Sequence, residues 1–125
     1  MIAILCDTQY SVGMTEFDDT FANQIMELRR GTIVLAILST LQQPRYGYAL
    51  LKALVQVGFI VEAGTLYPLL RRLEKQGVLE SEWNTDDVRP RKYYRLSGNG
   101  EELYIKLRSE WLETQATINK MIGKD

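Results

Sequence analysis

Arginine and lysine are the side chains in this sequence whose placement best suits a chemical task. They gather in two short segments, and the basic members are Arg71, Arg72 and Lys75 in the first segment and Arg89, Arg91, Lys92 and Arg95 in the second. No acidic residue interrupts the second segment, so its local field is positive although the chain carries a net charge of −1. Such a field attracts phosphate groups, because nearby charges rather than the total charge act on a bound polyanion. The alternative is that these side chains form a solvated surface or keep strand edges from pairing.

The sequence offers little for catalysis or metal binding. It contains no histidine, and Cys6 is its one cysteine. The usual general base, a Cys/His zinc site and a disulfide within the chain are therefore excluded. No pair of carboxylates or lysines lies in an apolar motif that would tune their pKa values. We expect a protein that is not an enzyme and that uses no metal or cofactor.

Length and composition indicate one soluble globular domain, because the 125 residues are 46% apolar and 25% charged. No apolar run reaches the roughly 20 residues of a membrane span, and the first residues lack the basic flank of a signal peptide. We therefore expect a cytoplasmic protein with no membrane partner. Residues 1–15 show no periodicity and are expected to be a flexible extension.

The spacing of apolar residues predicts the elements that position the basic segments. A period near 3.6 indicates helices over residues 16–41, 48–57 and 62–76. The period then changes to two, which predicts a hairpin with strands over 78–83 and 91–96. Ser97 is a suitable cap for a last helix over 98–122.

This order of elements is that of a mainly α winged helix-turn-helix with a small β-hairpin. Residues 16–97 would form the DNA-binding domain, and residues 98–125 a C-terminal dimerisation helix. In a helix-turn-helix the second helix enters the major groove, so the predicted contacts are Thr65, Tyr67, Arg71 and Arg72. The hairpin tip, with Arg89, Arg91 and Lys92, is expected to grip phosphates or enter the minor groove.

An apolar seam on the first and last helices predicts a homodimer. Its members recur at intervals of three, four or seven and are Phe21, Ile25, Leu28, Leu103, Leu107, Trp111, Ile118 and Met121. One small domain has too little surface to cover such a stripe, so a second copy is expected to bury it. A two-fold dimer would match a pseudo-palindromic site on double-stranded operator DNA.

Three motifs resemble those of the PadR family of transcriptional regulators. They are Tyr46-Gly47-Tyr48, the run Gly-Thr-Leu-Tyr-Pro-Leu-Leu-Arg-Arg-Leu-Glu-Lys-Gln-Gly over residues 64–77, and Arg-Lys-Tyr-Tyr-Arg-Leu over residues 91–96. The resemblance implies a bacterial or archaeal repressor, dimeric through its first and last helices and released from DNA by a small molecule. It also implies that Tyr46 and Gly47 form a turn that contacts the DNA backbone.

The short C-terminal part is similar to the branch of the family that includes multidrug-binding repressors. In one repressor of that branch, a tryptophan of the last helix and its mate across the dimer sandwich flat aromatic compounds, and Trp111 stands at the matching place. A planar aromatic or phenolic ligand is therefore implied, while the alternative role for Trp111 is a dimer-core anchor. The acidic net charge leaves one other function open, a winged-helix adaptor that captures proteins and does not bind DNA.

Overall fold

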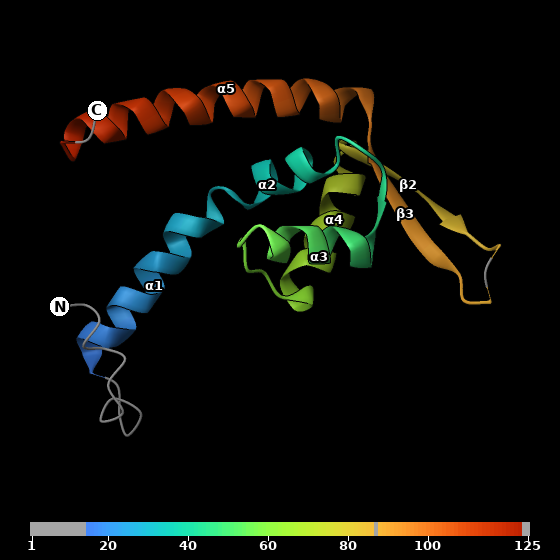
Figure 1. The fold of residues 1–125 in the computed structure, drawn as a ribbon, viewed down its shortest axis with the longest axis horizontal. Coiled ribbons are helices and arrows are strands. Elements are labelled where there is room, and N and C mark those ends of the chain that lie inside the picture. Colours follow the sequence, from blue (N-terminus) through green and yellow to red (C-terminus); the bar gives the residue numbers. More distant parts are fainter. Residues whose placement is uncertain (1–14, 87, 124–125) are drawn as a thin grey trace. The chain divides into compact units, whose positions relative to one another are not determined.

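The computed structural model describes residues 15–86 and 88–123, which form two compact units, one ending at Ile33 and the other beginning at Val34. Nearly all of the extension predicted for residues 1–15 lies outside the described part. The elements in chain order are α1 (Glu16–Arg30), α2 (Ile33–Thr40), β1 (Arg45–Tyr46), α3 (Gly47–Gln56), α4 (Ala63–Lys75), β2 (Leu79–Asn84), β3 (Arg91–Leu96) and α5 (Gly98–Met121) (Figure 1).

The single helix predicted over residues 16–41 is wrong, because the structure breaks it into α1 and α2. Gly31 caps the end of α1 and donates its backbone N–H to the carbonyl of Arg29. The Thr32 hydroxyl donates to the same carbonyl at 2.8 Å. Glycine is a poor helix former and threonine competes for backbone hydrogen bonds, so α1 ends here. The apolar spacing continues across this point, and for that reason the sequence pattern did not reveal the end of the helix.

The core of the second unit is made by α2, α3, α4 and the base of the hairpin. Its fully buried large side chains are Ile37, Leu38, Leu50, Leu54, Leu66, Leu70 and Leu79. The predicted inner face of α4 is confirmed, since Leu66, Leu69, Leu70 and Leu73 are all buried. The predicted helix stops are also confirmed, because Gly58 and Gly77 have φ of +93° and +81°.

Helix α4 carries a proline in its interior. The helix begins at Ala63, so Pro68 is its sixth residue and supplies no N–H to the carbonyl of Gly64. Both Gly64 and Pro68 are exposed. The face of α4 that lacks this hydrogen bond is therefore open to solvent.

The sheet has three antiparallel strands in the order β1-β3-β2. The predicted hairpin is confirmed, and its register runs from Leu79 opposite Leu96 to Asn84 opposite Arg91. The two-residue strand β1 was not predicted. It pairs Tyr46 with Tyr93 and so fixes the start of α3 against the hairpin. The hairpin of β2, β3 and their connecting turn is called the wing below.

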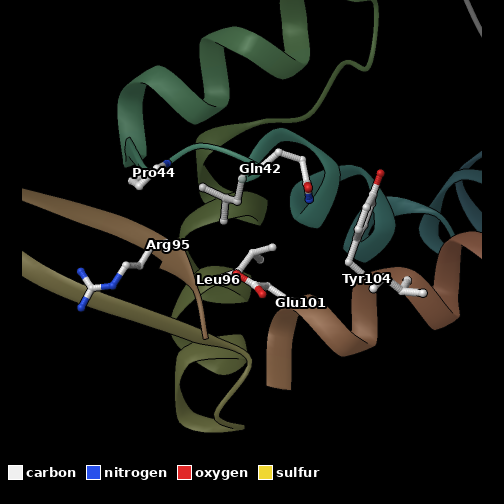
Figure 2. A pocket seen from close by; sticks show the side chains of 8 residues that line it. Gln42, Pro44, Arg95, Leu96, Glu101 and Tyr104 are labelled. Carbon is white, nitrogen blue, oxygen red and sulfur yellow. The ribbon is translucent and has the colours of Figure 1, made fainter. Parts of the chain in front are cut away.

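The turn between α2 and β1 is held by side-chain hydrogen bonds. Gln42 Nε2 donates to the carbonyl of Leu38 at 3.1 Å, and Arg45 Nε donates to that of Thr40 at 2.7 Å. This turn and the first turns of α5 together border a hollow (Figure 2).

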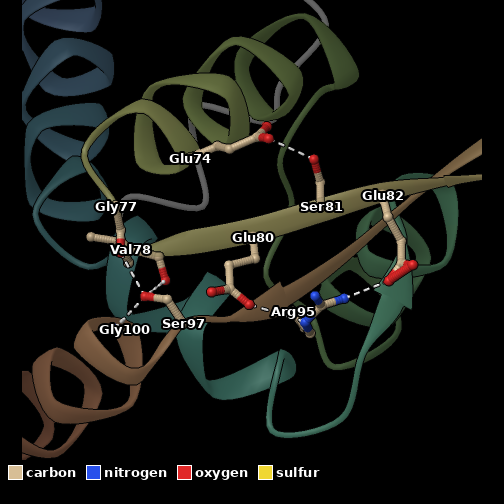
Figure 3. A network of polar contacts seen from close by, with 9 residues as sticks. All are labelled: Glu74, Gly77, Val78, Glu80, Ser81, Glu82, Arg95, Ser97 and Gly100. Carbon is tan, nitrogen blue, oxygen red and sulfur yellow. Dashed lines mark hydrogen bonds and ion pairs between the residues drawn. The ribbon is translucent and has the colours of Figure 1, made fainter.

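Helix α5 is anchored at its first turn. Ser97 caps it as predicted, since Oγ accepts from the N–H of Gly100 at 2.9 Å (Figure 3). A Cβ on Gly100 would lie 2.1 Å from the carbonyl oxygen of Val78, so only glycine fits there. In the part of the chain that the structure describes, no helix is long and apolar enough to cross a membrane.

Candidate nucleic-acid interface

A hollow of about 350 Å³ lies between α3, α4 and the wing. Six of the nine predicted DNA-binding residues line it, namely Tyr46, Gly47, Tyr67, Arg71, Arg91 and Lys92. Tyr48, Trp83 and Tyr94 add aromatic wall to the same hollow. The other three predicted residues, Thr65, Arg72 and Arg89, are exposed and do not line it.

The wall from α4 consists of Tyr67 and Arg71, which are one turn apart. A Cβ on Gly47 would lie 2.9 Å from Cε1 of Tyr67, so glycine makes room for this ring at the start of α3. Gly47 itself is buried. The structure thus gives Gly47 a packing role, and its predicted contact with DNA stays a prediction.

The opposite wall is built around Tyr46. The guanidinium carbon of Arg91 lies 4.2 Å from the centroid of the Tyr46 ring, a cation–π distance. Tyr93 meets the same ring edge-on, with centroids 4.8 Å apart. Asn84 donates a hydrogen bond to the Tyr46 hydroxyl. Strand β1, which was not predicted from the sequence, therefore places the Tyr46 ring against Arg91 at the hollow.

The side chain of Lys92 is more buried than expected for a residue at the hairpin tip. Its Nζ is 3.1 Å from Oε1 of Glu74 on α4, and 5.5 Å from the centroid of the Tyr94 ring. Ser81 Oγ donates to the other carboxylate oxygen of Glu74 at 2.6 Å. Lys92 thus connects the wing to α4, whereas the sequence predicted it at the hairpin tip.

The pKa values of two groups beside Lys92 reflect this environment. The hydrogen bond from Ser81 and the charge of Lys92 lower the pKa of Glu74, against an opposing effect of burial. Burial raises the pKa of Tyr94, and Glu74 adds to this rise while Lys92 and Arg71 oppose it. Glu74 is therefore ionised and Tyr94 neutral near pH 7.

Arg95 is paired with acidic residues of the neighbouring strand. Its Nε lies 3.1 Å from Oε1 of Glu80, and its Nη1 lies 2.8 Å from Oε1 of Glu82 (Figure 3). The basic segment that looked uninterrupted in the sequence is partly neutralised by carboxylates 13 and 15 residues earlier. The antiparallel register, which opposes Glu80 to Arg95, causes this pairing.

Positive charge nevertheless remains on α4. Over residues 15–86 and 88–123, neither Arg71 nor Arg72 forms an ion pair. Both side chains are exposed, as is Arg89 in the turn of the wing. Within the same residues no group of three or more acidic, cysteine or histidine side chains could hold a metal ion.

The predicted dimer seam divides into buried and open parts. On α5, Leu103 and Leu107 are half-buried, while Trp111, Ile118 and Met121 are 41%, 45% and 73% exposed. On α1, Phe21 and Ile25 are half-buried and Leu28 is exposed. The second half of α5 therefore presents large apolar side chains to solvent in the single chain.

A helix-turn-helix made by α3 and α4, followed by a two-stranded wing, defines a winged helix-turn-helix protein. The model of the transcriptional regulator PadR-like family matches residues 34–106, which is more than half of the 125 residues. The chain belongs to this family of transcriptional regulators. The predicted mainly helical winged-helix fold and the resemblance to the PadR family are confirmed. The role of the first and last helices in dimerisation and the similarity to the multidrug-binding branch stay predictions.

Two solved structures of similar proteins and one relative with a similar sequence agree with this assignment. A PadR family transcriptional regulator from Eggerthella lenta DSM 2243 has 43% identity and a TM-score of 0.78, with 87% of this chain and 97% of that one covered. A PadR-like transcriptional regulator from Bacillus cereus has 28% identity and a TM-score of 0.71, with 79% and 99% covered. A transcriptional regulator of Mycobacterium tuberculosis is 39% identical over 75 residues, 59% of this chain and 70% of that protein.

Proposed function

We propose that this protein is a homodimeric repressor that binds double-stranded operator DNA through α4 and the wing. The observation that carries the proposal is the hollow between these elements, which combines aromatic walls with Arg71, Arg91 and Lys92. Cationic and aromatic side chains at the junction of a recognition helix and a wing suit contact with a polyanionic duplex.

Helix α4 would lie in the major groove. Thr65, Tyr67, Arg71 and Arg72 belong to its first three turns, and the side chains that point inward from it are leucines. Arg71 and Arg72 can therefore contact phosphates or base edges without leaving a partner within the described chain.

The wing would contact the backbone beside that groove. Arg89 is exposed in the turn, and Arg91 is oriented by the Tyr46 ring at 4.2 Å. Lys92, held by Glu74 at 3.1 Å, would act as a positioning residue that sets the wing against α4. Arg89 and Arg91 would therefore contact phosphates and Lys92 would position the wing, whereas the sequence predicted that all three residues grip phosphates.

A homodimer would bury the exposed apolar part of α5. Trp111, Ile118 and Met121 recur at intervals of seven and three, and each is at least 41% exposed. Two copies related by a two-fold axis would present two recognition helices to a pseudo-palindromic operator. A planar aromatic or phenolic ligand would stack on Trp111, since an indole face offers about 0.5–1.5 kcal/mol beyond area burial.

The adaptor alternative rests on the net charge of −1 and on the pairing of Lys92 and Arg95 with carboxylates. It predicts that the arginines of α4 are dispensable for regulation. DNA binding is the better proposal, because Arg71 and Arg72 stay without ion pairs in the described chain.

Fluorescence anisotropy with a duplex from the gene's own promoter tests the proposal. We expect this duplex to bind more tightly than a scrambled one, with affinity that falls steeply with salt. Arg71→Ala should weaken binding by about a hundredfold, because a homodimer loses roughly one charge-assisted contact from each of its two copies. Arg108→Ala, which removes the same charge from α5, is the matched control. Equal, weak binding of both duplexes at every salt concentration would contradict the proposal.

A further inference from the structure

A second hollow, of about 340 Å³, lies where the turn after α2 meets the end of β3 and the first turns of α5. Its apolar wall comes from Leu41, Pro44, Leu96 and Ile105. Leu41 is 2% exposed, so the floor belongs to the core, whereas Ile105 is 66% exposed at the rim. A hollow of this size falls at the lower end of the range for small-molecule sites, about 300–1,000 Å³.

Three of the polar side chains around this hollow carry oxygen atoms that can accept hydrogen bonds, namely Gln42, Glu101 and Tyr104. Gln42 extends from its turn toward the ring of Tyr104, and Glu101 lies beside Leu96 (Figure 2). Gln42 Nε2 donates one of its two N–H groups to the carbonyl of Leu38, so the amide oxygen is available as an acceptor together with one remaining N–H. Glu101 forms no ion pair within residues 15–86 and 88–123.

Arg95 also borders the hollow, but its charge is already compensated. Both Glu80 and Glu82 bind its guanidinium, at 3.1 and 2.8 Å (Figure 3). An anion entering the hollow would therefore meet a satisfied guanidinium and an unpaired carboxylate at Glu101. A cation would meet that carboxylate with acceptor oxygens around it.

We propose that this hollow binds a small amphiphilic amine, with its ammonium group at Glu101 and its apolar body against Leu41, Leu96 and Ile105. An ammonium group has three donors and no acceptor, which matches a carboxylate, an amide oxygen and a phenolic oxygen. A carboxylate would be repelled by Glu101, and the guanidinium of Arg95 that could attract it is already bound by Glu80 and Glu82.

This site is distinct from the one implied at Trp111. Ten residues separate Glu101 from Trp111 on α5, which is about 15 Å along a helix. A bound amine would contact the turn after α2, the end of β3 and α5 at once. It would therefore restrain α5 relative to the winged helix, whether or not the proposed function is correct.

Calorimetry and amide NMR on the full chain test the proposal with three probes that share a phenylethyl group and differ in the charge of the head group. They are 2-phenylethylamine, the neutral 2-phenylethanol and the acid 3-phenylpropionate. We expect the amine to bind most tightly and to shift amide signals in 41–44 and 101–105. No binding of the amine at millimolar concentration, equal binding of all three probes, or shifts centred on Trp111 would overturn the proposal.

Two neighbouring glutamates supply a matched pair of variants. Glu101→Gln keeps the shape and removes the charge, and we expect it to weaken amine binding by about tenfold, since one charge-assisted hydrogen bond is lost. Glu102→Gln is the control, because Glu102 pairs with Lys106 at 3.1 Å and does not line the hollow. Equal affinities of the two variants for the amine would contradict the assignment. Circular dichroism checks that both variants fold.

Discussion

The Glu74 carboxylate of α4 lies 3.1 Å from the Lys92 ammonium of the wing, and Ser81 donates to the same carboxylate at 2.6 Å. This cluster joins the helix that would read DNA to the strand that would contact its backbone. Its side chains at Lys92 and Glu74 are only 27% and 33% exposed, so bulk water screens the pair less than it screens a surface ion pair.

A double-mutant cycle measures how strongly this pair couples the two elements. We expect Glu74→Gln, Lys92→Met and the double variant to give a coupling energy of about 0.5–1 kcal/mol in urea unfolding, as for a partly exposed ion pair. We also expect Glu74→Gln to lower the ratio of promoter to random-duplex affinity, because the wing loses its fixed position. A coupling energy of zero would show that the pair is only a surface contact.

The lowered pKa of Glu74 predicts how stability depends on pH. A carboxyl group with a lower pKa in the folded chain stabilises it above the usual value near 4.5, and this contribution is lost as the pH falls through the folded pKa. Between about pH 5 and 3, stability should therefore fall more steeply in the parent than in Glu74→Gln. Parallel curves for the two proteins would show that Glu74 contributes nothing to the slope.

A substitution at Gly64 in α4 can change the free energy of unfolding and the affinity for DNA in opposite directions. A Cβ there would meet nothing within 4 Å, and the residue has no positive φ, so the chain itself does not require glycine. Gly64→Ala should raise the free energy of unfolding by about 0.5–1 kcal/mol through helix propensity. If the duplex approaches this turn closely, promoter affinity should fall at the same time. A more stable variant with unchanged affinity would place the duplex elsewhere.

Gly100 in α5, unlike Gly64, is required by the packing of the folded chain. Its missing Cβ would lie 2.1 Å from the backbone oxygen of Val78, so Gly100→Ala should destabilise the chain by about 1–3 kcal/mol through overpacking. Gly98→Ala is the control two residues earlier, because a Cβ there has open space. Thermal unfolding of both variants gives the comparison, and equal melting temperatures would contradict the packing described here.

The signals that predicted the fold correctly were local ones. The leucines of α4 repeat at helical spacing, Gly77 stands where the helix must stop, and Ser97 precedes the last helix as a cap. Each feature depends on residues close in sequence, so periodicity and capping rules detect it. The break at Gly31 was not predicted, because apolar residues continue on both sides of it.

Features that depend on distant residues could not be predicted in this way. Lys92 pairs with Glu74, 18 positions earlier, and β1 is only two residues long, so neither leaves a periodic signal. Arg95 looked like part of a positive cluster until the strand register opposed it to Glu80. Six of the nine residues predicted to bind DNA line the hollow between α3, α4 and the wing, but tertiary contacts decide which of the charges there are paired.

Hydroxyl-radical footprinting of the parent protein on its promoter duplex tests the central claim most directly. A two-fold dimer with α4 in the major groove predicts two protected patches whose centres lie about 10 base pairs, or a multiple of that, apart. The Arg71→Ala variant should lose both patches together, because each copy contributes the same residue. Protection of a single patch, or a footprint unchanged in that variant, would contradict a dimer that reads DNA through α4.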